Sequence, residues 1–201
     1  MLSRVAIVIL AAGRATRMSG FNKLLSTIGN VPLVRISTAE AVYRGEGPVI
    51  VVTGHMAHEI RNAVTGLSVT VVHNDECASG MSSSVRAALR AIPEDCNGML
   101  IHLADMPLVT RAHLASMIEA FTLHEGIAIV RATAFGRFGN PVIVPRSLFS
   151  DLSAIDGDVG AREVISKSGV PIVSVEIGHV ASFDVDTIDD LKAAGGDLGA
   201  G

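Results

Sequence analysis

A glycine-rich turn and two basic residues follow the first apolar run of the chain. The run VAIVIL ends at Leu10, Arg17 and Lys23 stand downstream, and three small residues come first: Ala11, Ala12 and Gly13. Small residues let a ligand approach the backbone, whose N–H groups can bind an anion in such a turn. Arg17 and Lys23 would add the charge that a buried phosphate requires. The stretch indicates a phosphate site, and the alternative is a surface loop with solvated basic residues.

Three aspartates stand where strands are expected to end. Asp105 follows the apolar run 98–103, and a carboxylate there, facing an anionic ligand, suits Mg²⁺. The alternative is that Asp105 only begins a turn before Pro107. Asp184 and Asp186 alternate along FDVD, so they would point to one side of a short strand and repel each other unless they share a cation. The alternative for Asp186 is to cap the next helix, so Asp184 is the preferred second ligand.

Three consecutive serines open a helical pattern. GMSSSV places Ser82, Ser83 and Ser84 after Gly80 and before an apolar stripe at helical spacing. Ser82 could cap the helix, which is worth about 1 kcal/mol. Three serines exceed what a cap requires, and a helix N-terminus also attracts anions. We therefore expect this segment to contact a nucleotide or substrate.

These residues need strands and helices in alternation to position them. Helical patterns cover 31–44, 56–64, 82–92, 110–124 and 160–167, with a last helix from 187, and the apolar runs that predict strands are 5–10, 48–53, 69–73, 98–103, 127–130, 141–144, 171–176 and 182–185. Continuous apolar strands indicate burial on both faces, which is typical of a mostly parallel sheet covered by helices. The order predicts an α/β three-layer sandwich of Rossmann-like type. Ligands bind such sheets at the carboxyl ends of the strands, where the glycine-rich turn and Asp105 are expected.

Composition excludes several classes of protein. The 201 residues are 49% hydrophobic and fit one domain, and a formal charge of −4 without a basic tract argues against nucleic-acid binding. The apolar run 5–12 is too short to span a bilayer. Cys77 and Cys96 have no metal-ligand or redox spacing, and the seven histidines show no zinc spacing. We expect a cytoplasmic protein without a membrane segment.

Several segments together resemble a known family. LAAG, the Arg-Met pair at 17–18 and NKLL at 22–25 resemble the loop of the MobA-like nucleotidyltransferases, and most closely that of the molybdenum cofactor cytidylyltransferases. Later family segments follow in order: TGH (53–55), Asn74, GMSSSV (80–85), LADMPLV (103–109), FGNPV (138–142), GDVGAR (157–162) and FDVDTIDDL (183–191). The chain departs at Ser19, where many members have glycine, and Gly20 follows directly.

The resemblance implies a role for each segment. Catalysis is implied for Lys23, Arg17 and Asp105, and metal binding for Asp105, Asp184 and Asp186. Nucleotide binding is implied for Leu10, Ala11, Ala12, Gly13, Arg17, Lys23, Thr53, Gly54, Asn74, Gly80, Ser82, Ser83 and Ser84. Acceptor binding is implied for Gly139, Asn140, Pro141, Gly157, Asp158, Gly160 and Arg162. The alternatives are that Gly139 and Gly157 serve turns and that Arg162 is a solvated helix residue.

The implied reaction is transfer of CMP from CTP to the phosphate of molybdopterin, with Mg²⁺ or Mn²⁺ and release of pyrophosphate. Residues 1–132 would bind the nucleotide, residues 133–195 would bind the acceptor and complete the metal site, and 196–201 would form a flexible tail. A molybdenum hydroxylase or its maturation chaperone is the implied recipient. Guanylyl-transferring relatives have Gly-Gly where this chain has Ala11 and Ala12, which implies that a methyl at Ala12 favours a pyrimidine. Three alternatives remain: a related enzyme that uses GTP or another phosphorylated acceptor, an oxidoreductase that reuses the nucleotide pocket, and a cofactor carrier.

Overall fold

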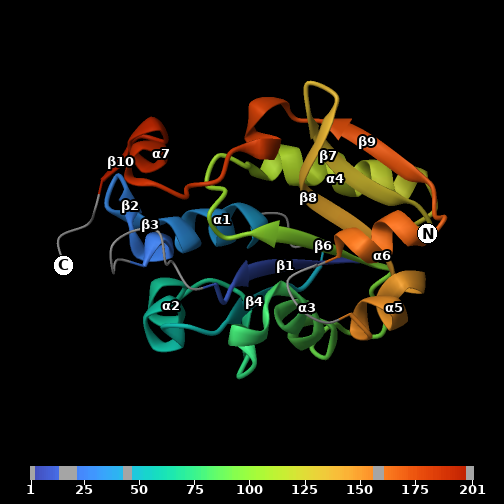
Figure 1. Cartoon of the computed structure of the whole chain (residues 1–201), viewed down its shortest axis with the longest axis horizontal. Helices are drawn as coiled ribbons and strands as arrows, with labels where there is room; N and C mark the ends of the chain where they lie inside the picture. The colour runs from blue at the N-terminus through green and yellow to red at the C-terminus, as the bar shows by residue number, and fades with distance from the viewer. Residues whose placement is uncertain (1–2, 14–21, 43–46, 156–160, 198–201) are drawn as a thin grey trace.

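A seven-stranded sheet forms the centre of the molecule (Figure 1). The computed structural model describes residues 3–13, 22–42, 47–155 and 161–197. The strands lie in the order β5-β4-β1-β6-β8-β7-β9, and every neighbouring pair is parallel except the two pairs that involve β8. Their bounds are β1 Val5–Ala11, β4 Val49–Thr53, β5 Thr70–His73, β6 Gly98–Leu103, β7 Ile129–Ala134, β8 Arg137–Pro145 and β9 Ile172–Glu176. The predicted α/β class with a mostly parallel sheet is confirmed.

Helices cover both faces of this sheet, which explains why its strands are apolar throughout. Ile7 and Ile9 of β1 pack into one core and Val8 into the other, because successive side chains of a strand point to opposite faces. The first core receives side chains from α1 (Leu33–Val42), α2 (Ala57–Ala63) and α4 (Arg111–Leu123). The second receives them from α3 (Met81–Leu89), α5 (Phe149–Ser153) and α6 (Arg162–Lys167). The result is a three-layer sandwich.

The strand order reverses between β1 and β6. From β1 the chain moves outward to β4 and β5, and then returns to β6 on the other side of β1. Leu10 lies opposite Leu103, and the Ala104 N–H donates to the Leu10 carbonyl at 3.2 Å. Open α/β sheets bind ligands at such a reversal, beyond the carboxyl ends of the strands. The glycine-rich turn and Asp105 are therefore neighbours at the expected place.

A small second sheet lies at the end of the molecule that holds α7 (Ile188–Ala193) (Figure 1). It consists of β2 (Thr27–Ile28), β3 (Val31–Pro32) and β10 (Gly196–Asp197), with β10 antiparallel to β2. The prediction of a flexible tail from residue 196 is therefore wrong for Gly196 and Asp197. A Cβ on Gly196 would lie 2.6 Å from both Leu191 Cδ1 and the Thr27 carbonyl oxygen, so a glycine permits this close pairing. Residues 198–201 lie outside the described part of the chain.

The predicted strand at 182–185 is also wrong. Gly178–Ser182 forms the 3₁₀ helix η5, and the segment after it has no regular structure. The Val185 N–H donates to the Asp105 carbonyl at 2.9 Å, so this segment pairs with the loop after β6 and not with a strand. Other short 3₁₀ helices are η1 Lys23–Leu25, η2 Cys77–Ser79 and η3 Arg146–Leu148. Within the described ranges, no helix has both the length and the apolar character to cross a membrane.

The two halves expected on either side of residue 132 contribute strands to the same sheet. The boundary falls inside β7, and β8 from the second half lies between β6 and β7. The two halves are therefore sequence segments of a common core, and their separate binding roles remain a prediction.

His102 on β6 has an unusual environment. The side chain is fully buried, and neither ring nitrogen has a hydrogen-bond partner in the part of the chain that the structure describes. Burial lowers the pKa of His102 from 6.5 to about 4, because the charged imidazolium loses its hydration. Between these values the unfolded chain binds a proton that the folded chain does not, so acid favours unfolding.

We therefore expect stability to fall as the pH drops from 6.5 to 4, with about 3 kcal/mol of it due to His102. His102→Leu removes this contribution, so its free energy of unfolding should vary less steeply with pH in that window. Urea unfolding at several pH values measures the slope. His58→Gln, at an exposed histidine, is the control and should keep the wild-type slope. Equal slopes in His102→Leu and wild type would contradict the prediction.

Candidate active site

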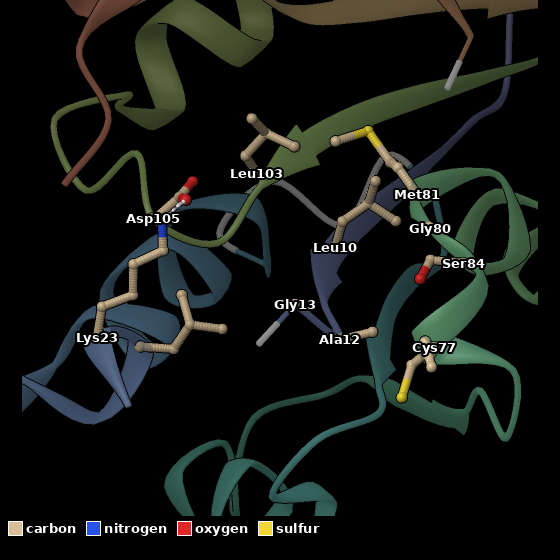
Figure 2. A pocket seen from close by; sticks show the side chains of 12 residues that line it. Leu10, Ala12, Gly13, Lys23, Cys77, Gly80, Met81, Ser84, Leu103 and Asp105 are labelled. Atoms are coloured by element: carbon tan, nitrogen blue, oxygen red, sulfur yellow. Dashed lines mark ion pairs between the residues drawn. The ribbon is translucent and has the colours of Figure 1, made fainter. Parts of the chain in front are cut away.

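A cavity of about 390 Å³ opens at the carboxyl ends of β1 and β6 (Figure 2). Figure 2 shows Lys23 and Asp105 on one side of it and Met81, Ser84 and Cys77 on the other. The residues that line it are Leu10, Ala12, Gly13, Lys23, Leu24, Cys77, Ala78, Gly80, Met81, Ser84, Leu103 and Asp105. Most of the wall is apolar, and the charged groups are confined to one side. This arrangement suits a ligand with a flat apolar part and an ionic part.

Three carboxylates meet beside this cavity. One carboxylate oxygen from each of Asp105, Asp184 and Asp186 lies within 4.8 Å of the other two. The backbone bond from Val185 to Asp105 brings the two segments together. Thr187 is the N-cap of α7, with its side chain accepting from the Asp190 N–H, so the capping role considered for Asp186 is filled by its neighbour. The three residues predicted as metal ligands are therefore adjacent in space.

Lys23 connects this cluster to the cavity. Asn22 Oδ1 accepts from the Leu24 N–H and fixes the start of η1. Lys23 Nζ then lies 2.6 Å from Asp105 Oδ2 and 2.6 Å from Asp186 Oδ1, with 18% of the side chain exposed. Burial opposes the ammonium charge, but the ion pairs with Asp105 and Asp186 prevail and raise the pKa of Lys23. Lys23 is thus a charged residue at neutral pH.

The carboxylate cluster has the properties of a divalent-cation site. Asp105 Oδ1 is buried, and none of the described residues donates a hydrogen bond to it, which is costly unless a ligand satisfies it. Burial, followed by the charges of Asp105 and Asp186, raises the pKa of Asp184. A divalent cation that prefers oxygen ligands, such as Mg²⁺ or Mn²⁺, would bind Asp105 Oδ1 and reduce the repulsion between the carboxylates. The residues present therefore fit such an ion.

The serine segment divides between the cavity wall and the layer behind it. Ser84 lines the cavity, whereas Ser82 and Ser83 are buried, and the Ser83 hydroxyl donates to the Gly80 carbonyl at 2.7 Å. The N-cap of α3 is Gly80, which makes no side-chain capping bond, so Ser82 does not cap the helix. Asn74 Nδ2 donates to Ser83 Oγ at 2.8 Å and to Ser84 Oγ at 3.0 Å. Asn74 is buried and orients the serine hydroxyls from behind.

Other predicted nucleotide contacts also lie behind the wall. Thr53 is fully buried, and its hydroxyl donates to the Val72 carbonyl at 3.2 Å. Ala11 packs into the first core. Gly54 supports the wall, since a Cβ there would lie 2.5 Å from Cys77 Cβ and 3.0 Å from Ala12 Cβ. The described residues that line the cavity thus include Leu10, Ala12, Gly13, Lys23, Gly80 and Ser84 from the prediction, but not Ala11, Thr53, Gly54, Asn74, Ser82 or Ser83.

A second cavity of about 440 Å³ adjoins the first, because Met81 and Leu103 line both. Its other lining residues are Val85, Ile101, Arg131, Phe138, Gly139, Asn140, Val142, Ala161, Arg162 and Ile165. Gly139, Asn140 and Arg162 were predicted as acceptor contacts, and they gather here. Pro141 does not line the cavity. Arg17, Gly157, Asp158 and Gly160 lie outside the described residues.

Sequence reasoning missed several of these wall residues. The apolar side chains of Met81, Leu103 and Cys77 give no sequence signal for a ligand contact. They line the cavity because of where the strands end. Arg131 carried a signal, because it is a charged residue directly after the apolar run 127–130. Phe138 begins the FGNPV segment but was not considered as a contact.

The cavity lies where the strand order reverses, and a carboxylate cluster and a lysine flank it. This geometry is typical of α/β proteins that bind a ligand at the carboxyl ends of their strands. The comparison with known families is more specific. Residues 7–172 match the MobA-like NTP transferase domain, and the chain belongs to this family of nucleotidyltransferases.

Individual relatives agree with this assignment. The chain is 30% identical over 133 residues to the bifunctional protein GlmU of Desulfotalea psychrophila, a match that covers 66% of the chain but 39% of that relative. It is similar in structure to a Mycobacterium tuberculosis Rv0371c homologue from Mycobacterium sp. strain JC1, with a TM-score of 0.83, 30% identity and 96% of each chain covered. It is also similar to Rv0371c of M. tuberculosis H37Rv in complex with manganese, with a TM-score of 0.77, 25% identity, and 95% and 97% of the two chains covered.

Proposed function

We propose that this nucleotidyltransferase transfers CMP from CTP to the phosphate of a molybdopterin-type acceptor and releases pyrophosphate. One observation carries the proposed transfer: the cavity beside the Asp105 cluster shares its wall with the cavity that holds Asn140 and Arg162. Two phosphorylated substrates bound in these cavities would meet next to the cluster. The choice of CTP and of molybdopterin rests on the resemblance of the LAAG loop to cytidylyltransferases.

The chemistry requires positioning and charge neutralisation. An oxygen of the acceptor phosphate forms a bond to the α-phosphorus of CTP. The bond from that phosphorus to the oxygen bridging to the β-phosphorus breaks, and pyrophosphate leaves with the electron pair. Lys23 lines the nucleotide cavity, where its ammonium can neutralise the phosphates, and Arg17 is proposed to assist.

We assign the divalent cation, Mg²⁺ or Mn²⁺, to Asp105, Asp184 and Asp186. When bound, the ion would supply Lewis-acid stabilisation of the phosphate charge. The manganese complex of the Rv0371c relative supports this choice of ion class. Cytoplasmic location and delivery of the product to a molybdenum hydroxylase or its chaperone are further parts of the proposal. The two cysteines, which are free in the structure, are consistent with a reducing compartment.

Pyrophosphate release tests the reaction. Purified protein is incubated with Mg²⁺ or Mn²⁺ and each nucleoside triphosphate, with molybdopterin, a hexose 1-phosphate or no acceptor. We expect release with CTP and molybdopterin together. Release with GTP or only with the sugar phosphate would establish the related-enzyme alternative. Bound nicotinamide without release would establish an oxidoreductase, and nucleotide or cofactor binding without release would establish a carrier.

The selection of the base provides a second test, at Ala12. Its side chain is buried and lines the nucleotide cavity, where a methyl reduces the room for a purine. Ala12→Gly should lower the ratio of kcat/KM for CTP to that for GTP by roughly tenfold, because one misfitting methyl costs about 1 to 3 kcal/mol. Steady-state kinetics with both nucleotides measures the ratio.

Ala11→Gly is the matched control, since Ala11 packs into the core and does not line the cavity. It should leave the ratio unchanged. An unchanged ratio in Ala12→Gly, or a wild type that prefers GTP, would show that residue 12 does not select the base.

A further inference from the structure

Arg131 is a charged side chain among buried residues of β7. Its neighbours Val130 and Ala132 are fully buried, whereas Arg131 is partly buried and lines the second cavity. The guanidinium carbon lies 4.6 Å from the centroid of the Phe138 ring, and Nη2 donates to the Gly139 carbonyl at 3.3 Å. Both partners belong to β8. These contacts hold the guanidinium plane in one orientation.

One further donor of this guanidinium, the Nε–H group, is buried. Among the residues that the structure describes, no group accepts a hydrogen bond from Arg131 Nε. A buried donor without a partner costs free energy, so such groups in folded proteins usually serve a ligand or a water molecule. The Nε–H group is a donor that an anion could accept from, and the Phe138 ring holds the guanidinium in place for such a contact.

A second arginine adds another positive charge to this cavity. Arg162, the first residue of α6, lines the same cavity, and no carboxylate is among the described residues that line it. Burial, followed by the charge of Arg162, lowers the pKa of Arg131, as expected for two neighbouring cations that repel each other. An anion placed between them would remove this repulsion. Arg guanidinium groups bind phosphate with two parallel hydrogen bonds.

We propose that Arg131, together with Arg162, binds the phosphomonoester group of the acceptor. This inference rests on the proposed function, which places the acceptor in the second cavity. The shared wall residues Met81 and Leu103 put a phosphate held there beside the nucleotide cavity. The uncharged wall, which includes Val85, Ile101 and Ile165, gives the rest of the acceptor an apolar surface. Arg131 is then an acceptor-binding residue that determines specificity for phosphorylated acceptors.

The experiment uses inorganic phosphate as the probe and nuclear magnetic resonance of the arginine Nε–H groups as the readout. Phosphate is titrated into wild-type protein saturated with α,β-methylene CTP, so that it cannot enter the nucleotide site, and into protein without nucleotide. We expect a saturable shift of the Arg131 Nε–H signal, which is assigned by its absence in Arg131→Gln. The phosphate Kd should rise about tenfold or more in Arg131→Gln. It should rise by less in Arg131→Lys, which keeps the positive charge but lacks the paired N–H donors of a guanidinium.

Arg137→Gln is the matched control, because Arg137 is an exposed arginine of β8 that does not line the cavity. It should bind phosphate as wild type does, and thermal melting of each variant verifies folding. No saturable phosphate binding in wild type, or an equal Kd in folded Arg131→Gln, would overturn the inference. The analogue titration tests the nucleotide site separately: failure to bind any nucleoside triphosphate would reject the proposed function, whereas normal binding with no Arg131 effect would reject only this inference.

Discussion

Asp105→Asn is expected to lower metal-dependent pyrophosphate release by about 10²-fold or more while leaving the fold intact. The carboxylate belongs to the three-aspartate cluster, and its Oδ2 pairs with Lys23. Its Oδ1 is buried and has no hydrogen-bond partner within the described residues, so we expect this carboxylate to bind a ligand. Loss of a Lewis acid at a phosphoryl centre removes several kcal/mol of charge stabilisation. The backbone bond from Val185 to Asp105 survives the substitution, and Lys23 keeps its ion pair with Asp186. Turnover, Mn²⁺ affinity and thermal unfolding are measured together.

Asp189→Asn is the control for this substitution. Asp189 is a highly exposed carboxylate on α7, at 95% side-chain exposure, and its contact is with Lys192 outside the cluster. Its turnover should equal that of wild type. If Asp105→Asn retained near-normal turnover and Mn²⁺ affinity, the cluster would not be the metal site.

Lys23→Met is expected to tighten Mn²⁺ binding to the nucleotide-free protein by about tenfold while weakening every nucleoside triphosphate alike. Lys23 Nζ lies 2.6 Å from both Asp105 Oδ2 and Asp186 Oδ1, so the ammonium occupies oxygen atoms that a cation needs. Removing it leaves the partly buried carboxylates available and removes a like charge from the metal site. Triphosphate binding weakens because Lys23 contributes charge to the cavity and not contacts to a base.

Electron paramagnetic resonance of free Mn²⁺ measures metal affinity without any turnover. Lys192→Met, at an exposed lysine of α7, should behave as wild type. Unchanged Mn²⁺ affinity in Lys23→Met would show that the ammonium does not compete with the metal. A loss confined to one nucleotide would show that Lys23 reads the base.

The strands of the sheet were predictable where burial requires a continuous run of apolar residues. β1, β4 and β6 are continuous apolar runs because helices cover both of their faces, and this alone predicts a parallel sheet. The antiparallel direction of β8 was not predictable, since its run PVIV has the same apolar pattern as a parallel strand. Its place between β6 and β7 depends on long-range pairing that leaves no local pattern.

The site was predictable for residues at strand ends and less so elsewhere. Asp105 and Lys23 were expected next to one another because β1 and β6 carry their segments to the same edge. The sequence predicted that Asp184 and Asp186 lie on one side of a short strand. Their segment is irregular in the structure, and the backbone hydrogen bond from Val185 to Asp105 holds it at the cluster. Arg131 was missed because its partners, Phe138 and Gly139, come from strand pairing that the sequence does not reveal.

The packing of Gly54 restricts how the wall of the first cavity could change during evolution. A side chain at residue 54 would collide with Cys77 and touch Ala12, and both of these residues line the cavity. A side chain at residue 54 therefore requires Cys77 to shift or to be replaced by a smaller residue. Mutational paths that place a side chain at residue 54 should therefore include Cys77→Ala or Cys77→Gly. A combinatorial library at residues 54 and 77 should contain folded variants that single-site libraries at residue 54 do not contain.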